Sequence, residues 1–413
     1  MDERIEVHLV TNSAARDADE VSRSALRIGS RLQALPGIHI SLYVRQMLRN
    51  GQASPGLQCD LVDVQREVEK SYPPPVAGMS SPGAVEDSEK SVMALLALRN
   101  AIRSRMQANP AERHLVVSPC AVYGGIIAQR TAEDLGIPHI ACMRQDTDLA
   151  RHYYQRTGPP LFEYISRRAA WIVTGNPYQE RRLREDCGRN GQITTIPESV
   201  ECLDGMWSRR CRRDHVRLIA DCGYANRKGT HLLVEAVGRL RAEGLDIRLS
   251  LAGPTDPAAP GPAYWAEMRK ANEEADPAGF AFADVMAPEE ASEFLLNGDI
   301  YCSPSVCEGV SIGPCRALAA GMPVVATGTR PEIDMAAGAS HVVLYPPGDQ
   351  NALLSAIGKL ARALDEGRLE IDQSRVEEWR SELAQEREEL AWKNTLREVL
   401  DHEFFRTDMC RLS

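Results

Sequence analysis

The stretch Asp299–Glu332, DIYCSPSVCEGVSIGPCRALAAGMPVVATGTRPE, contains the most informative structural pattern in the chain. It begins with a short apolar segment, Ile300–Ser303, which is typical of a buried strand. A polar turn then leads into a helix that opens near Gly313-Pro314 and closes at Gly321, since proline favours the first helical positions and glycine follows the last turn. A second apolar segment, Pro323–Ala326, comes next. This order of strand, helix and strand indicates a unit of a parallel sheet.

The same alternation extends along most of the chain in two series. The first series of predicted strands comprises Ile5–Val10, His39–Val44, His114–Val117, His139–Met143 and Trp171–Thr174. The second series comprises Arg217–Cys222, Arg248–Ala252, Gly279–Phe282, Ile300–Ser303, Pro323–Ala326 and His341–Leu344. We therefore predict an α/β fold class with two Rossmann-like, doubly wound domains that face a central cleft.

A charged connector after Pro197, CLDGMWSRRCRRD, separates the two series and suggests a domain boundary near residue 200. We expect domains at residues 1–200 and 201–385. The segment 386–413 lies in a charge-rich region without strand patterns, and we expect a helix there that packs back on the N-terminal domain. The proline-rich segment Tyr72–Glu89 is interpreted as a mobile loop.

Composition excludes several classes of protein. The 413 residues are 43% hydrophobic and 26% charged, as in globular proteins, and the formal net charge of −10 opposes a broad nucleic-acid surface. No segment approaches the roughly 20 apolar residues of a membrane helix. The eleven cysteines form no CxxC pair, and the start MDERIEVHLV resembles no signal peptide. We therefore expect a cytoplasmic protein with reduced thiols, no metal and no cofactor.

Two segments have the features of an anion-binding site. In the first, Gly309 and Gly313 allow close approach to the backbone at the start of a helix, where free N–H groups and the helix dipole favour phosphate. Glu308 in the preceding turn could accept hydrogen bonds from sugar hydroxyls. The helix in question would also carry Ser311 and Ile312 at its start.

The second segment is DCGYANRKGTHLLVEAV, residues 221–237. A strand ends at Gly223, and the turn before the next helix holds Asn226, Arg227 and Lys228. A cation is unfavourable at the N-terminus of a helix unless an anion accompanies it, so these residues predict an anionic partner. The segment is not a Walker loop, and no GxGxxG follows the first strand, which argues against an NTPase or a nicotinamide enzyme.

The ordered series of motifs resembles the retaining GT-B glycosyltransferases of glycosyltransferase family 4. In the first domain, GIPHIACMRQDTDL and AAWIVTGNPYQERRL resemble two of the family's conserved patterns. The other matching positions are Gly223, Lys228-Gly229, Pro304-Ser305, Glu308-Gly309, Ala317-Leu318-Ala319, Gly321, Pro323-Val324-Val325-Ala326, Pro331-Glu332 and Pro346-Pro347-Gly348-Asp349.

The resemblance implies that the second domain binds a nucleotide-diphosphate sugar, of UDP or GDP type, and that the first binds a small-molecule or lipid-linked acceptor. It implies metal-independent transfer with retention, in which Lys228 contacts the diphosphate and Glu308 holds the donor sugar. Asp148 occupies an acceptor-side position after its strand, but Asp-x-Asp-Leu is also a common helix N-cap. The candidate catalytic residues are thus Glu308, Lys228 and Asp148. The candidate donor-binding residues are Gly223, Asn226, Arg227, Lys228, Glu308, Gly309, Ser311, Ile312, Gly313 and Arg316.

Three positions depart from the family pattern. The second glutamate of the family's Glu-x7-Glu pair falls on Arg316, which can only donate hydrogen bonds and so cannot hold the ribose as a carboxylate does. The arginine of the family's G-R-L falls on Tyr224, and Thr329-Arg330 replaces a glycine pair. Three explanations of these departures are open: the arginines have moved within the pocket, the donor differs in its nucleotide, or donor chemistry was lost. The alternatives are a non-catalytic nucleotide- or partner-binding protein, or a pseudo-glycosyltransferase that couples a cyclitol.

Several groups also have a purely structural interpretation. Arg316 would then lie on the outer face of its helix, and Cys302, Cys307 and Cys315 would be small buried side chains rather than metal ligands. The arginines of segments 181–184 and 209–213 are interpreted first as solvated surface, which leaves peripheral membrane contact open. The sequence predicts no oligomeric state.

Overall fold

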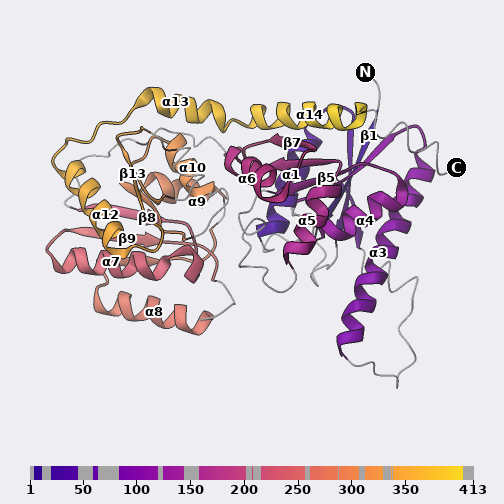
Figure 1. Ribbon diagram of the computed structural model, residues 1–413. Helices are drawn as coiled ribbons and strands as arrows, with labels where there is room; N and C mark the ends of the chain where they lie inside the picture. The colour runs from indigo at the N-terminus through magenta and orange to yellow at the C-terminus, as the bar shows by residue number, and fades with distance from the viewer. Residues whose placement is uncertain are drawn as a thin grey trace. The chain divides into compact units, whose positions relative to one another are not determined.

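The chain forms two compact α/β units, seen here in a computed structural model (Figure 1). The structure describes residues 4–11, 20–44, 59–63, 83–119, 124–143, 158–200, 207, 215–255, 261–286, 288–306, 312–328, 336 and 338–402. One unit comprises residues 1–197 together with 388–413, and the other comprises residues 198–387. Each unit is built around one parallel sheet.

The first unit contains a seven-stranded sheet in the order β3-β2-β1-β4-β5-β6-β7, in which all paired strands are parallel. The order reverses between β1 and β4, so the connections leave these two neighbours in opposite directions. The strands are β1 (Ile5–Thr11), β2 (Ile38–Val44), β3 (Asp60–Asp63), β4 (Arg113–Ser118), β5 (His139–Met143), β6 (Trp171–Thr174) and β7 (Gln192–Thr195).

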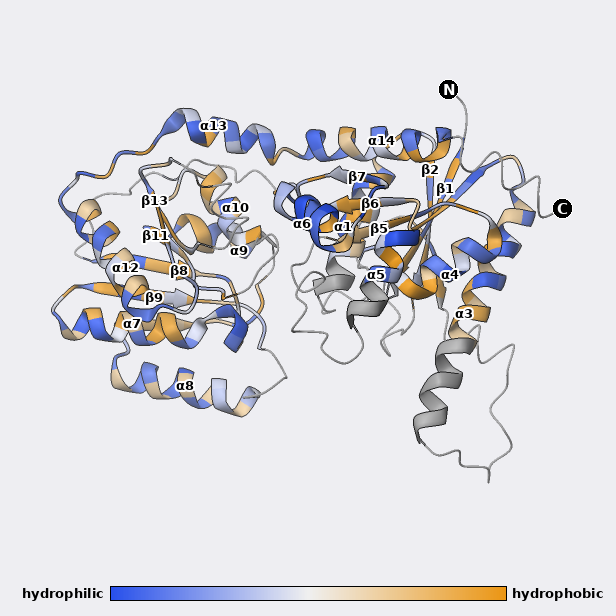
Figure 2. Cartoon of the chain, viewed as in Figure 1, coloured by the Kyte–Doolittle hydropathy of each residue, from blue (hydrophilic) through white to orange (hydrophobic). Residues whose placement is uncertain are grey.

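Helices cover both faces of this sheet, because its central strands are apolar on both sides. Val7 and Leu9 of β1 belong to the core on one face, whereas Val10 belongs to the core on the other. Figure 2 shows hydrophobic strands inside each unit and hydrophilic residues along α6. The described helices of this unit are α1 (Glu20–Gln33), α3 (Gly83–Ala108), α4 (Gly125–Leu135), α5 (Gly158–Arg168), α6 (Pro177–Cys187) and α14 (Gln385–Asp401).

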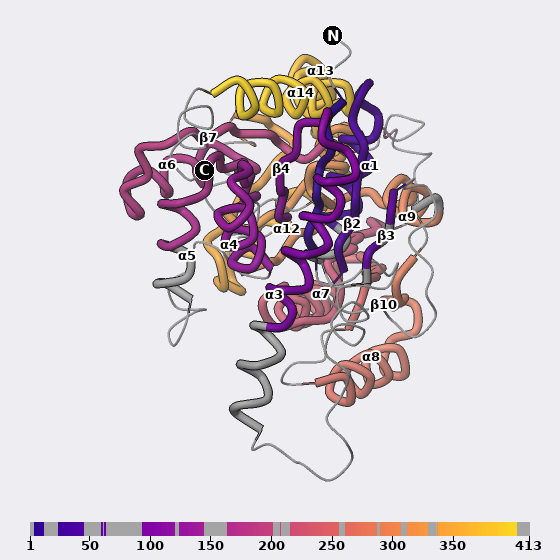
Figure 3. Tube along the Cα trace, turned by 90° about the vertical axis from the view of Figure 1, so that its right-hand side faces the viewer, coloured from indigo at the N-terminus to yellow at the C-terminus, as the bar shows by residue number. Residues whose placement is uncertain are grey.

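The C-terminal helix α14 completes the core of the first unit. Trp392 and Leu396 are buried in the same cluster as residues of β1 and α1. Glu388 lies 3.4 Å from the Nε atom of Arg31 on α1. Both views of the chain place α14 beside α1 (Figures 1 and 3). The end of the chain therefore contributes to the unit in which the chain begins.

The second unit contains a six-stranded parallel sheet in the order β10-β9-β8-β11-β12-β13, which reverses between β8 and β11. The strands are β8 (Val216–Ala220), β9 (Ile247–Leu251), β10 (Phe280–Phe282), β11 (Ile300–Ser303), β12 (Val324–Thr327) and β13 (Val342–Tyr345). The described helices are η2 (Asn226–Lys228, a 3-10 turn), α7 (Thr230–Ala242), α8 (Pro262–Ala275), α9 (Pro288–Leu296), α10 (Ile312–Ala319), α12 (Gln350–Asp365) and α13 (Gln373–Glu382).

Successive residues of β8 face opposite sides of this sheet, as the period of a strand requires. Leu218 and Ala220 pack in one core with residues of α7 and α12. Ile219 packs in the other core with residues of α10 and α13. The helices on the two faces thus hold the carboxyl ends of β8 and β11 in place.

The predicted fold class, two doubly wound α/β domains, is confirmed by this architecture. Each predicted strand coincides with an observed strand to within two residues at either end. Two edge strands, β3 and β7, were absent from the prediction. The loop predicted for Tyr72–Glu89 is wrong in its last part, because residues 83–89 form the first turns of α3. Residues 72–82 lie outside the described ranges.

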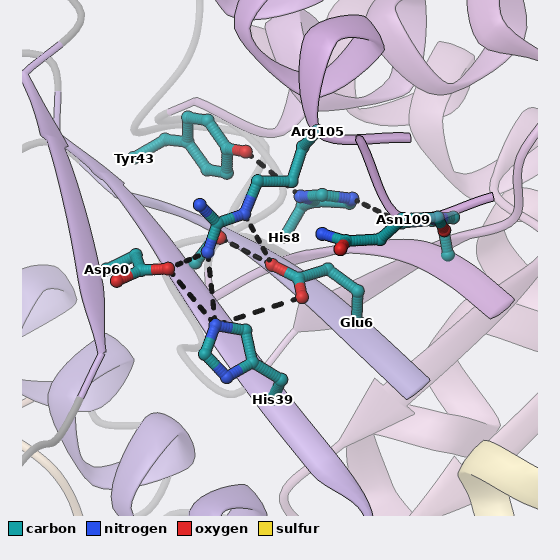
Figure 4. A network of polar contacts seen from close by, with 9 residues as sticks. Glu6, His8, His39, Tyr43, Asp60, Arg105 and Asn109 are labelled. Carbon is teal, nitrogen blue, oxygen red and sulfur yellow. Dashed lines mark hydrogen bonds and ion pairs between the residues drawn. The ribbon is translucent and has the colours of Figure 1, made fainter. Parts of the chain in front are cut away.

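A network of polar side chains is buried in the first unit against the α3 face of the sheet (Figure 4). Glu6 of β1 is fully buried. Its Oε1 atom accepts hydrogen bonds from Ser41 Oγ at 2.5 Å and from Arg105 Nε at 3.2 Å. Glu6 is the second residue of β1, so this network lies toward the amino edge of the sheet rather than at its carboxyl edge.

The same network contains two histidines, His8 of β1 and His114 of β4. His114 Nε2 donates to the carbonyl of Asn109 at 3.2 Å, and its Nδ1 atom lies 3.2 Å from Nε2 of His8. His8 Nδ1 then accepts from the hydroxyl of Tyr43 at 3.0 Å. Burial, and secondarily the charge of His114, lowers the pKa of His8 to about 3. Burial lowers the pKa of His139 on β5 to about 3 as well.

The lowered pKa values of His8 and His139 predict a loss of stability in mild acid. In the unfolded chain they take up protons below about pH 6.5, whereas in the folded chain they stay neutral down to about pH 3. The free energy of unfolding should therefore fall between pH 6.5 and pH 3, by roughly 1 kcal/mol per pH unit for each histidine. Urea titrations followed by circular dichroism at several pH values measure this slope.

His8→Asn provides the comparison. This variant removes one of the two titrating groups, so its free energy of unfolding should depend less steeply on pH than that of the wild type. Equal slopes for the two proteins would show that His8 does not contribute to the acid sensitivity.

Candidate functional site

The carboxyl ends of β8 and β11 are the natural place for a ligand in the second unit. These strands are neighbours, but β8 continues to β9 on one side and β11 continues to β12 on the other. The connections that follow them diverge and leave a crevice, the usual ligand position in open parallel sheets. Both segments that the sequence indicates as candidate anion sites, residues 221–237 and 304–316, begin at these two strand ends.

The turn after β8 depends on Gly223. Its φ angle is +76°, and a Cβ atom there would lie 2.5 Å from the carbonyl oxygen of Pro254, so a glycine is required on both counts. The backbone N–H of Gly223 donates to Ala252, and its carbonyl accepts from Thr230 Oγ1 at 2.6 Å. Gly223 therefore shapes the turn from the sheet to α7.

Asn226, Arg227 and Lys228 form the short 3-10 turn η2 between Gly223 and α7. Asn226 is exposed, whereas Arg227 and Lys228 are partly buried. The turn ends at Gly229, which has a φ angle of +66° and serves as the N-cap of α7. The predicted order of strand, basic turn and helix is thus observed, with both cations at the carboxyl edge of the sheet.

A close backbone contact joins this turn to the segment that follows β11. A Cβ atom on Gly229 would lie 2.0 Å from the carbonyl oxygen of Pro304, so the two backbones touch where the glycine has no side chain. One step further on, the N–H of Val306 donates to the carbonyl of Arg227 at 2.8 Å. The structure therefore brings together two predicted elements that lie about 75 residues apart in sequence.

Three positions of helix α10 are less buried than the rest of the helix. Pro314, Cys315 and residues 317–319 are buried, whereas Ile312, Gly313 and Arg316 are only partly buried. These three positions are spaced three and four residues apart and so share one side of the helix. The side chain of Arg316 forms no hydrogen bond or ion pair with the described residues. It therefore supplies positive charge on the side of α10 that also contains Gly313.

Two residues that the sequence did not single out lie beneath Gly313. The hydroxyl of Tyr301 on β11 donates a hydrogen bond to Oδ1 of Asp221, the residue after β8. A Cβ atom on Gly313 would lie 2.0 Å from that hydroxyl and 2.4 Å from that carboxylate oxygen. Sequence patterns could not reveal this pair, because its members are 80 residues apart. Its only local signal is a charged residue at the end of an apolar strand.

Tyr224 has a structural role in the second unit. Its side chain is 0% exposed, and its hydroxyl lies 3.0 Å from the carbonyl of Leu251 and 2.8 Å from that of Ala283. Its ring lies under the guanidinium of Arg269, 4.8 Å from the centroid. Burial raises the pKa of this phenol well above its usual value, so it remains a hydrogen-bond donor. Tyr224 thus links the ends of β9 and β10 and does not face the crevice.

Several predicted site residues lie outside the described parts of the chain. These are Asp148, Glu308, Gly309 and Ser311, together with Thr329 and Arg330 at the substituted glycine pair. The described candidates Gly223, Asn226, Arg227, Lys228, Ile312, Gly313 and Arg316 all belong to the two segments that begin at the carboxyl ends of β8 and β11.

The described residues contain no group of three or more histidine, cysteine or acidic side chains that could hold a metal ion. The cysteines that the structure describes, Cys302 and Cys315 among them, are free thiols. On α6, Arg182 pairs with Asp186 and Arg184 pairs with Glu180, as expected of a solvated helix face. Among the helices described, none is long and apolar enough to cross a membrane.

Comparison with known protein families places the site within a defined domain. Residues 215–363 match the family described as Glycosyl transferases group 1. A segment of 135 residues is 30% identical to the MMP alpha-(1->4)-mannosyltransferase of Mycolicibacterium hassiacum. That segment covers 32% of this chain and 31% of the relative, so the match spans about a third of the relative's length.

Solved structures match nearly the whole chain. The pneumococcal O-GlcNAc transferase GtfA, in complex with UDP and GlcNAc, superposes with a TM-score of 0.71 at 11% identity, over 97% of this chain and 100% of that one. Anabaena HepE, in complex with UDP and glucose, gives 0.69 at 10% identity, over 96% and 100%. Sucrose-phosphate synthase from Thermosynechococcus elongatus gives 0.68 at 18% identity, over 96% and 99%.

Together these matches define the class of protein. The chain has the GT-B fold of two Rossmann-like units, as predicted. The candidate site at β8 and β11 lies within the residues that match the glycosyl transferases group 1 family.

The contact between Gly229 and Pro304 predicts that Gly229→Ala is strongly destabilising. An alanine at this φ angle costs about 1–2 kcal/mol. The overlap with the Pro304 carbonyl should add about 1–3 kcal/mol, because backbone must move. Gly367→Ala is the matched control, since Gly367 has a φ angle of +67° and open space around its Cβ position.

Urea denaturation of the two variants separates the steric term from backbone strain. We expect Gly367→Ala to lower the free energy of unfolding only by the cost of backbone strain. Gly229→Ala should lower it clearly more. Equal losses of stability would mean that the contact between the two segments is not a tight constraint.

Proposed function

We propose that this protein is a retaining, metal-independent glycosyltransferase that moves a sugar from a nucleotide-diphosphate sugar to a small-molecule or lipid-linked acceptor. The observation that carries the proposal is the contact between the turn after β8 and the segment after β11. It joins Arg227 and Lys228 to the segment that leads into α10, within a group 1 glycosyl transferase domain.

The charges at this edge suit a diphosphate. Lys228 and Arg227 supply cations from one segment, and Arg316 supplies another from α10. A departing nucleoside diphosphate gains negative charge as the bond to the sugar breaks, and preorganised positive groups stabilise that charge. In the proposed mechanism these side chains take the place of a metal ion, and Lys228 contacts the diphosphate.

The remaining donor contacts are assigned from the family resemblance. Glu308, Gly309 and Ser311 lie in the segment between β11 and α10, where a carboxylate would hold hydroxyls of the transferred sugar. Ile312 and Gly313 begin α10, whose free N–H groups favour a phosphate. Gly223 and Asn226 complete the donor site on the side of β8.

We assign acceptor binding to the first unit, with Asp148 as the candidate residue there. The connection after β5 contains Asp148, and it follows a strand whose carboxyl end lies on the ligand-binding edge of an open parallel sheet. The transferred sugar would keep its anomeric configuration, with the departing diphosphate accepting the proton of the acceptor hydroxyl. A UDP-type donor is the first choice, since GtfA and HepE were both solved with UDP.

Removal of the cations should weaken donor use. We expect Lys228→Ala to lower kcat/KM for the donor by about 100-fold, in the range measured when one stabilising donor is removed from an active site. Arg316→Ala should lower it by about 10-fold, because Arg316 has no described protein partner that would compete with the ligand. Donor turnover with UDP- and GDP-sugars measures both effects.

Lys359→Ala is the matched control, because Lys359 is an exposed lysine of α12 in the same unit. Wild-type rates for Lys228→Ala and for Glu308→Ala would refute the site assignment. Calorimetric binding of nucleoside diphosphates without any turnover would instead identify the protein as a non-catalytic GT-B binder.

Retention and metal independence predict two further results. The anomeric proton of the product, followed by NMR from the start of the reaction, should show the same configuration as the donor. Activity should survive dialysis against EDTA with less than a twofold change, because the proposed cations belong to the protein. An inverted product would refute the mechanism, and recovery of lost activity by added Mg²⁺ or Mn²⁺ would refute metal independence.

A further inference from the structure

A carboxylate and a phenol form a pair at the carboxyl edge of the second sheet. Asp221 directly follows β8, and Tyr301 is the second residue of β11, the neighbouring strand. The hydroxyl of Tyr301 donates to Oδ1 of Asp221. The pair lies at the position where the strand order reverses, which is the crevice of the proposed donor site.

The phenol holds the carboxylate in one orientation. Tyr301 is 1% exposed and belongs to the core that includes Ile219 and Ala317. Burial raises the pKa of its hydroxyl well above the usual value, and the charge of Asp221 raises it further. Tyr301 therefore keeps its proton and has only one hydrogen to donate, which is directed at Oδ1.

The first turn of α10 closes over the pair. Gly313 has no side chain, and the hydroxyl and the Oδ1 atom occupy the space that a Cβ atom would take. The positive end of the helix dipole favours a negative charge at this place. Gly313 also shares its side of α10 with Arg316. Asp221 is therefore next to the helix turn that was assigned to the donor.

The other carboxylate oxygen of Asp221 is open. Within the described residues its Oδ2 atom has no hydrogen-bond partner, and it is not among the buried polar atoms without one. Asp221 itself is only partly buried, so this oxygen is in contact with solvent. At the opposite edge of the same two strands, Oδ2 of Asp299 accepts the backbone N–H of Arg217 at 2.8 Å. Asp299 thus lies at the amino edge of the sheet, away from the crevice, whereas Asp221 lies at the carboxyl edge.

We propose that Oδ2 of Asp221 accepts a hydrogen bond from a hydroxyl of the nucleotide-sugar, and that Tyr301 is a positioning residue for this carboxylate. The inference rests on the proposed function. Lys228, Arg227 and Arg316 can only donate hydrogen bonds, so they suit the phosphates but not the hydroxyl hydrogens of the ligand. The ligand hydroxyl belongs either to the ribose or to the transferred sugar.

Asp221→Asn is the diagnostic substitution. The hydroxyl of Tyr301 still requires an acceptor, so the amide oxygen should face Tyr301 and the NH₂ group should replace the open oxygen. Isothermal titration calorimetry with UDP, UDP-glucose, GDP and GDP-mannose measures the effect. We expect the Kd of the nucleotide that the wild type binds to rise by about 10-fold in this variant. Asp299→Asn, the control at the opposite edge of the same strands, should leave Kd unchanged.

The ligands distinguish the two sources of the hydroxyl. If Asp221→Asn raises Kd equally for the nucleoside diphosphate and for its sugar conjugate, and has no effect on Kd for a 2′,3′-dideoxy nucleotide, Asp221 binds the ribose. If Asp221→Asn raises Kd for the sugar conjugate alone, Asp221 binds the transferred sugar. Unchanged Kd values in Asp221→Asn, with binding lost in Lys228→Ala, would overturn the inference and leave the proposed function standing. Absence of nucleotide binding by the wild type would overturn both.

Tyr301→Phe tests the positioning role. We expect a smaller rise in Kd than in Asp221→Asn, on the same ligands, and no additional loss when the two substitutions are combined. A lower melting temperature together with unchanged Kd values would show that Tyr301 serves only the core and would overturn its assignment.

Discussion

The candidate site depends on one backbone contact, the approach of Gly229 to the carbonyl of Pro304. This contact fixes the distance between the turn after β8 and the segment after β11, and the hydrogen bond from Val306 to Arg227 extends it. The cations of one segment are thereby held beside the residues that lead into α10. A side chain at position 229 would separate them. The absence of a single Cβ atom thus links the packing of the sheet to the proposed chemistry.

The contact is possible because the sheet beneath it is covered on both faces. One core, with residues of α7 and α12, packs on one face of β8 and β11, and a second core, with residues of α10 and α13, packs on the other face. Rigid strand ends place the loops at a defined separation, and the strand order opens a crevice between them. A few cations are therefore concentrated at this edge, although the net charge of the protein is −10.

Most of the fold could be predicted from the sequence, because strands buried on both faces appear as continuous apolar runs and glycine or proline marks the helix ends. The edge strands β3 and β7 could not, since four residues such as QITT are short and only partly buried. The start of α3 was mistaken for loop because its sequence continues from a proline-rich segment. Among the candidate residues, the basic turn Asn226–Lys228 and the start of α10 were found where their motifs predicted them.

The sequence by itself determined the class of fold, the two candidate segments at the site and the cations they carry, because each of these depends on residues close together in the chain. Only the tertiary structure decided how those residues are used. Tyr224, at a position that suggested ligand binding, is buried as a link between β9 and β10. Asp221 and Tyr301, which no local pattern connects, form a pair because β8 and β11 are adjacent in the sheet. Strand order is a property of packing across the whole unit, and no short segment encodes it.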